Sequence, residues 1–263
     1  MASSHQIASI SGPALGGLFF GWLGVSSTAG IVCSVLLLAL GTLWWIQAFP
    51  NPLPSSDKSE SKRTELLSGL RFVFRHPILL SALSLDMISV FFGGVTALLP
   101  IYAGEILMVG PKGLGALRAA PAIGAALMSL SLTKWDSRER AGPGLLWAVT
   151  GFGACVLVFA VSRNYLLSLT ALALSGAFDS VSMVVRMAAV QLSSPDSMRG
   201  RISAVNSIFI GSSNELGAFE SGVVAHLFGA VPAAVLGGLV CLATVVTVAW
   251  LSPRLSNLNL EEL

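Results

Sequence analysis

Six ionisable side chains interrupt otherwise apolar segments of this chain, and they are the residues with the most evident chemical potential. They are Asp86, Arg118, Asp179, Arg186, Glu215 and Glu220. An ionised group inside an apolar helix costs several kcal/mol unless it is paired or faces water. Charges at such positions are typical of a path or a binding site for a polar molecule. These residues are therefore the first candidates for function.

The composition indicates that these charges lie in a membrane protein. Apolar residues make up 54% of the chain and charged residues only 11%, whereas a soluble domain carries about 25% charged residues. The formal net charge of +2 is too small to indicate nucleic-acid binding. The three cysteines lie singly in apolar runs and the three histidines are scattered. We therefore expect no metal site, no disulfide and no cofactor.

The apolar segments are long enough to cross a membrane as helices, which need about 20 residues each. The strict alternation of apolar and polar residues that is typical of strands is absent from them. The sequence therefore predicts an all-α integral membrane protein, a helical bundle with eight spans. These are 6–23, 28–48, 78–102, 113–132, 143–161, 165–191, 202–227 and 230–251.

A polar connection divides these spans into two unequal groups. We expect residues 1–48 to hold two spans, 49–77 to form a cytoplasmic linker, 78–252 to form a six-helix unit, and 253–263 to be a cytoplasmic tail. Within the linker, residues 64–75 carry leucines and aromatics at helical spacing. Two interpretations fit this segment: a helix lying on the membrane surface, or an ordinary amphipathic connection.

The basic residues predict the orientation of the chain. Eleven Lys and Arg residues fall in the linker, in two alternate loops and in the tail, whereas the other connections hold two, Lys112 and Arg163. Basic residues accumulate on the cytoplasmic side of a membrane. Both termini are therefore expected in the cytoplasm, and the chain is expected to be a multi-pass protein of the cell (plasma or inner) membrane.

Depth along the helices predicts how the charges pair. Asp86 and Arg186 both fall roughly 6–11 Å to the cytoplasmic side of their span centres, at 1.5 Å per residue. Because a buried charge is costly without a partner, we expect these two residues to approach each other. Arg118 and Glu220 fall roughly 7–9 Å to the outer side. We expect Arg118 to approach Glu220 or a cavity.

Asp179 and Glu215 are the two acids left near mid-membrane, where no basic residue shares their depth. Because desolvation disfavours the carboxylate, such a group can hold and release a proton, which makes both residues candidates for proton coupling. A structural hydrogen bond to a backbone carbonyl is the alternative for both. Next to Glu215, Asn214 belongs to a polar stripe of its helix. That stripe either joins neighbouring helices or lines a cavity.

Several local patterns resemble a known family of transporters. Residues 11–17, Ser-Gly-Pro-Ala-Leu-Gly-Gly, resemble the end of a Gly- and Pro-containing signature of exporters in the major facilitator superfamily. The segments 69–77 (GLRFVFRHP), 117–121 (LRAAP) and 195–201 (PDSMRGR) resemble a subgroup of that superfamily, the one that includes the enterobactin exporter. The resemblance covers nearly the whole chain.

The resemblance implies a fold of two six-helix halves that move around a site at the membrane midplane. The chain resembles one complete half preceded by two helices of the other, without the first four helices. It implies a proton-coupled exporter of a small amphipathic molecule, siderophore-like or drug-like. Its expected partners are the lipid bilayer, the substrate, and a missing N-terminal half or a second copy. The alternative is a fragment that does not transport, or a split half that needs a partner chain.

An intramembrane enzyme is the remaining class of function. Ser212 and His226 lie on one predicted helix but are roughly 21 Å apart along its axis. A nucleophile and its base must come within hydrogen-bond reach, so this pair cannot act together within that helix. We predict that the protein is not an enzyme.

Overall fold

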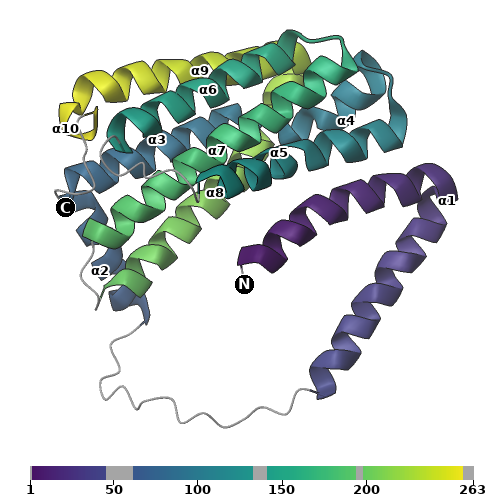
Figure 1. Cartoon of the computed structure of the whole chain (residues 1–263), viewed down its shortest axis with the longest axis horizontal. Coiled ribbons are helices and arrows are strands. Elements are labelled where there is room, and N and C mark those ends of the chain that lie inside the picture. The colour runs from purple at the N-terminus through teal and green to yellow at the C-terminus, as the bar shows by residue number, and fades with distance from the viewer. Residues whose placement is uncertain (1, 46–61, 133–140, 194–197, 257–263) are drawn as a thin grey trace.

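The computed structural model describes residues 2–45, 62–132, 141–193 and 198–256, and their regular structure is helical throughout (Figure 1). The predicted all-helical class is confirmed. The long helices are α1 (Ala2–Trp45), α2 (Lys62–Arg75), α3 (Pro77–Gly93), α5 (Gly110–Leu132), α6 (Ala141–Val161), α7 (Tyr165–Ser193), α8 (Arg199–Phe228) and α9 (Ala230–Leu251). The short elements are the 3₁₀ turn η1 (Val95–Leu98), α4 (Leu99–Ile101), the π turn η2 (Tyr102–Ile106) and α10 (Pro253–Ser256).

Five helical segments of the described residues are long and apolar enough to cross a membrane. They are Pro77–Ile106, Gly110–Leu132, Ala141–Val161, Tyr165–Ser193 and Ala230–Leu251, and each matches a predicted span. Helix α8 occupies the predicted span 202–227 and is long enough, but its Asn, Ser and Glu residues lower its hydropathy. The count of eight spans is therefore not confirmed.

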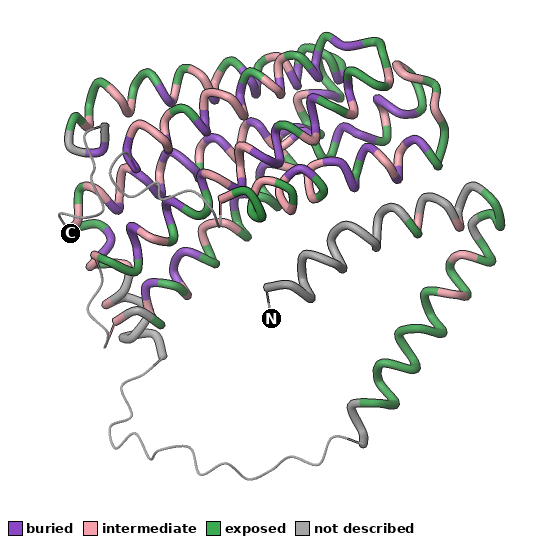
Figure 2. The backbone as a smooth tube through the Cα atoms, in the orientation of Figure 1, coloured by how far each residue is buried: buried purple, intermediate pink, exposed green. Residues whose placement is uncertain are grey.

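The first two predicted spans form the two arms of α1, which are separated at Gly24 (φ 76°, ψ 178°). A residue with a Cβ is strained at such a positive φ, whereas glycine adopts it freely and allows the chain to bend sharply there. Helix α1 packs on α5. Its second arm, with the apolar helix Ser26–Thr42, stands away from the bundle. Side chains on this arm are exposed, including Leu37 (68%) and Leu38 (71%) (Figure 2).

Helices α3 to α9 form a bundle beside α1 (Figure 1). Helix α7 packs against both α5 and α6, α9 packs against α6 and α3, and α8 packs against α3. Small residues permit these close contacts between membrane helices. The division into units at residues 48, 77 and 252 stays a prediction; the loop 133–140 and the tail beyond residue 256 lie outside the described residues.

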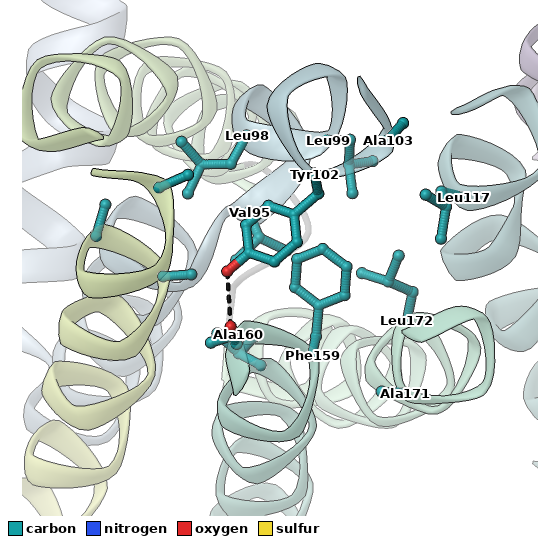
Figure 3. Close-up of a cluster of buried hydrophobic side chains, with 14 of the residues drawn as sticks. Val95, Leu98, Leu99, Tyr102, Ala103, Leu117, Phe159, Ala160, Ala171 and Leu172 are labelled. Atoms are coloured by element: carbon teal, nitrogen blue, oxygen red, sulfur yellow. Dashed lines mark hydrogen bonds between the residues drawn. The ribbon is translucent and has the colours of Figure 1, made fainter. Parts of the chain in front are cut away.

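One end of the bundle is held by a buried aromatic pair. Tyr102 and Phe159 are fully buried, with ring centroids 4.5 Å apart. The Tyr102 hydroxyl donates a hydrogen bond of 2.8 Å to the carbonyl of Ala160, which lies in the last turn of α6 (Figure 3). A buried tyrosine needs a partner for its hydroxyl, and this bond supplies one. The contact ties the turn after α3 to the end of α6.

At the opposite end of the bundle, α2 is docked against the helix ends by its apolar side. Val73 is fully buried in a cluster that contains Leu79 of α3 and Ile202 of α8. His76 separates α2 from α3, and Pro77 occupies the first turn of α3, where a missing N–H costs nothing. The predicted helix within 64–75 is therefore part of α2, and packing fixes which of its faces is exposed.

Candidate functional site

Polar side chains from four helices line a partly open cavity of about 250 Å³ in the bundle. Five of the seven residues predicted from the sequence line it: Asp86 (α3), Arg118 (α5), Asp179 and Arg186 (α7), and Asn214 (α8). These residues are far apart in the chain, and the crossing of α3, α5, α7 and α8 brings them together. The cavity thus gathers four of the six intramembrane charges.

Asp86 and Arg186 form an ion pair across the cavity wall, between the Asp86 Oδ1 and Arg186 Nη1 atoms. Their side chains are 7% and 4% exposed, so water screens the pair very little. Each charge alone would be costly in this setting, and the pairing offsets part of that cost. The pairing predicted from matched depth is confirmed.

Asp179 lies on the same helix as Arg186, seven residues or about two turns earlier. It is half-buried and lines the cavity, and the structure records no ion pair for it among the described residues. Arg118 is exposed and lines the same cavity. The cavity therefore holds a compensated ion pair, and in addition one acid and one base.

The pairing of Arg118 with Glu220 is not found, and no ion pair within the described ranges joins these residues. Arg118 lines the cavity instead. Glu220 is half-buried and Glu215 is exposed, and neither lines the cavity. Asp179 and Glu215 were predicted at the same depth, and the rotation of their helices directs only Asp179 toward the cavity.

The polar stripe of α8 serves both of the roles that were left open. Ser221 of the stripe is buried in the bundle, as expected for a residue between helices, whereas Ser203 and Ser207 are exposed. Asn214 lines the cavity. The two interpretations therefore apply to different residues of the same helix.

Helices α5 and α7 approach each other closely beside the cavity. A Cβ at Gly176 would overlap the carbonyl oxygen of Pro121, and a Cβ at Gly124 would overlap that of Ala173. Both positions thus require glycine at this crossing. Pro121 and Gly176 also line the cavity, so this helix crossing forms part of the cavity wall beside Asp179.

Neutral residues complete the lining, and no sequence pattern places them at a cavity. Thr96 comes from η1, and Phe152, Leu172 and Met183 supply apolar walls from α6 and α7. Ser175 also lines the cavity, but its hydroxyl donates to the carbonyl of Leu172 at 2.8 Å. Such residues are common in every membrane helix, so only the fold identifies them. Within the described ranges, no group of three His, Cys, Asp or Glu residues is arranged to hold a metal ion.

Comparison with known proteins gives a family and a set of relatives. Residues 1–217 match the family model described as Major Facilitator Superfamily. Curated relatives include the enterobactin exporter EntS of Escherichia coli O1:K1 / APEC and that of Escherichia coli O45:K1 (strain S88 / ExPEC). Each is 28% identical over 202 residues, which are 76% of this chain and 47% of the relative. The EntS of Escherichia coli O139:H28 (strain E24377A / ETEC) is 27% identical over the same shares of both chains.

The chain spans about half the length of these relatives. No solved structure matches it significantly.

Proposed function

This chain belongs to the Major Facilitator Superfamily, and from that membership we propose that it carries the cavity of a proton-coupled exporter of small amphipathic molecules. The family consists of transport proteins rather than enzymes. The observation that carries the proposal is the cavity itself, in which an ion pair, a further acid and a further base meet inside a membrane bundle. Charges held at such a cost are typical of a transport path.

Asp179 is the proposed proton carrier. It lines the cavity, it is half-buried, and it has no ion-pair partner among the described residues. Asp86 is held by Arg186, so its charge is already compensated. A carboxyl that can change its protonation state without breaking a salt bridge suits coupling to a proton gradient.

The proposed substrate is amphipathic, siderophore-like or drug-like. Phe152, Leu172 and Met183 offer apolar contacts, while Arg118 and Asn214 offer hydrogen-bond donors in the same cavity. Ligand sites commonly combine apolar walls with a few polar groups that fix orientation. The relatives named as enterobactin exporters favour a siderophore-like molecule within this class.

A second bundle is needed for transport in this proposal. Alternating access requires two bundles that move around one site, and this chain spans 47% of the relatives it matches. We propose that an N-terminal half or a second copy supplies the facing bundle. The alternative is a membrane protein that does not transport. The exposed apolar arm of α1 is available for contact with lipid or with that bundle.

The proposed orientation places α2 and both termini in the cytoplasm. Its support is the distribution of basic residues, eleven on this side against two on the other. A multi-pass location in the inner membrane agrees with the spans and with the exporter relatives.

Complementation tests the proposal. The chain would replace the matched region of EntS in an Escherichia coli strain that lacks its own exporter, and efflux of enterobactin would be measured at two external pH values. We expect Asp179→Asn to abolish pH-driven efflux without loss of expression. The matched control is Glu215→Gln, an acid at the same depth that faces away from the cavity. Equal loss in both variants, or full efflux in Asp179→Asn, would refute the role of Asp179.

A further inference from the structure

A second hollow lies outside the bundle, between α2 and the start of α8. It is a groove of about 670 Å³. Its described lining consists of Ser68, Leu70, Arg71, Phe72, Phe74, Arg75 and Met198. The lining combines two arginines with five other side chains, four of them apolar, and no acidic residue is among those described. The cavity of the transport proposal shares none of these residues.

The groove lies at the level where the membrane meets water. Helix α2 ends at Arg75, and the membrane span Pro77–Ile106 begins two residues later. Figure 1 shows α2 at the end of the bundle, beside the start of α8. A phospholipid headgroup occupies this level of a bilayer, with its acyl chains on the bundle side.

Packing fixes the face of α2 that borders the groove. Val73 is fully buried in its cluster with α3 and α8, which prevents α2 from turning about its axis. Arg71, Phe74 and Arg75 are all exposed, and their spacing of i, i+3 and i+4 puts them on one helix face. Phe74 is 60% exposed although it is a large apolar residue.

A third guanidinium lies at the rim of the groove. Arg201 of α8 donates from Nη1 to the Ser68 hydroxyl at 3.3 Å, and Ser68 belongs to the lining. Ser68 stands one turn before Arg71 on α2. Positive charge from both helices therefore surrounds one apolar hollow.

We propose that this groove binds an anionic phospholipid, with the phosphate held by Arg71 and Arg75 and an acyl chain lying along Leu70, Phe74 and Met198. Guanidinium groups bind phosphate through two parallel hydrogen bonds, which favours arginine at such sites. Basic clusters next to membrane helices attract anionic lipids. The apolar part of the lining and the exposed Phe74 favour a lipid over free phosphate. The bound lipid fastens α2 to the bundle end.

The test measures lipid binding to the purified full chain in detergent by native mass spectrometry. The probes are phosphatidylglycerol, the neutral phosphatidylcholine, and glycerophosphoglycerol, which is the headgroup without acyl chains. We expect phosphatidylglycerol to bind in preference to both. At about 5-fold in affinity per arginine, Arg71→Gln/Arg75→Gln should bind phosphatidylglycerol about 25-fold more weakly. Arg163→Gln, an exposed arginine in the connection between α6 and α7, is the matched control and should bind as the unchanged chain does.

A second variant distinguishes binding of a whole lipid from binding of its phosphate-containing headgroup alone. Phe74→Ser should weaken phosphatidylglycerol several-fold and leave glycerophosphoglycerol unchanged. Equal binding of phosphatidylcholine, or an equal loss in Arg163→Gln, would overturn the proposal. Glycerophosphoglycerol binding as tightly as phosphatidylglycerol would make the groove a phosphate site and would likewise refute a lipid site.

Discussion

The ion pair between Asp86 and Arg186 makes a quantitative prediction about stability. Removing one partner of a buried pair leaves the other charge uncompensated, at a cost of about 3–5 kcal/mol. Side chains that are only 7% and 4% exposed have little water to take the place of the lost partner. Arg186→Gln and Asp86→Asn should therefore each lower stability by an amount in this range.

The double variant Asp86→Asn/Arg186→Gln should be much less affected than either single variant. Two neutral amides in place of the pair carry no buried charge, and replacing both partners of such a pair is often close to neutral. In a double-mutant cycle the coupling between the two positions should be favourable and several kcal/mol in size. Such coupling is characteristic of residues in direct contact.

Thermal unfolding of the purified chain in detergent measures these differences. For a chain of about this size, each kcal/mol shifts the Tm by about 2–4 °C, so the single variants should lose about 6–20 °C. Arg163→Gln, an exposed arginine, serves as the control and should stay close to the unchanged chain. Single variants no less stable than this control, or a double variant that loses the sum of both, would refute the argument.

Three further predictions concern packing, activity and recognition. Gly176→Ala should lower the free energy of unfolding by about 1–3 kcal/mol or more, because the new Cβ would overlap the Pro121 carbonyl. The control Gly222→Ala has open space around the new Cβ and should change the Tm by a degree or two at most. Purified chain alone in proteoliposomes should show no saturable efflux driven by a pH gradient; such efflux from a monomer would contradict the need for a second bundle. Arg118→Gln should weaken an anionic ligand of the cavity more than a neutral one, and equal losses in a binding titration would contradict a role for its charge.

The sequence was sufficient for the all-helical class, for five of the predicted spans and for one of the two charge pairings. Apolar length located the spans because a membrane helix must cover a fixed thickness. Matched depth found Asp86 with Arg186, because both helices cross the same bilayer and a buried charge needs a partner. The same argument failed for Arg118 with Glu220. Depth does not tell which way a helix faces, and here Arg118 lines the cavity while Glu220 does not.

Other features depend on three-dimensional packing and left no distinct pattern in the chain. The sharp bend at Gly24 lies between two predicted spans, and its backbone conformation is one that glycine adopts without strain. The glycines that bring α5 and α7 together look like any other small residue in a membrane helix. Thr96 and Phe152 are equally unremarkable until the turn after α3 and the course of α6 bring them to the cavity.

The charge balance of the cavity determines what kind of coupling the proposed mechanism allows. Asp86 and Arg186 cancel each other, so the remaining charge depends on Asp179 and Arg118. With Asp179 ionised the cavity is neutral overall, and with Asp179 protonated it carries one net positive charge.

A cationic ligand would compete with the proton for this cavity. Exchange requires such competition, because each occupant must displace the other. An anionic ligand would instead bind better together with the proton, and the two would travel in the same direction. Export by proton exchange therefore fits a cationic ligand, or a neutral one whose donors bind the Asp179 carboxylate, and Arg118 becomes the residue that selects between these cases.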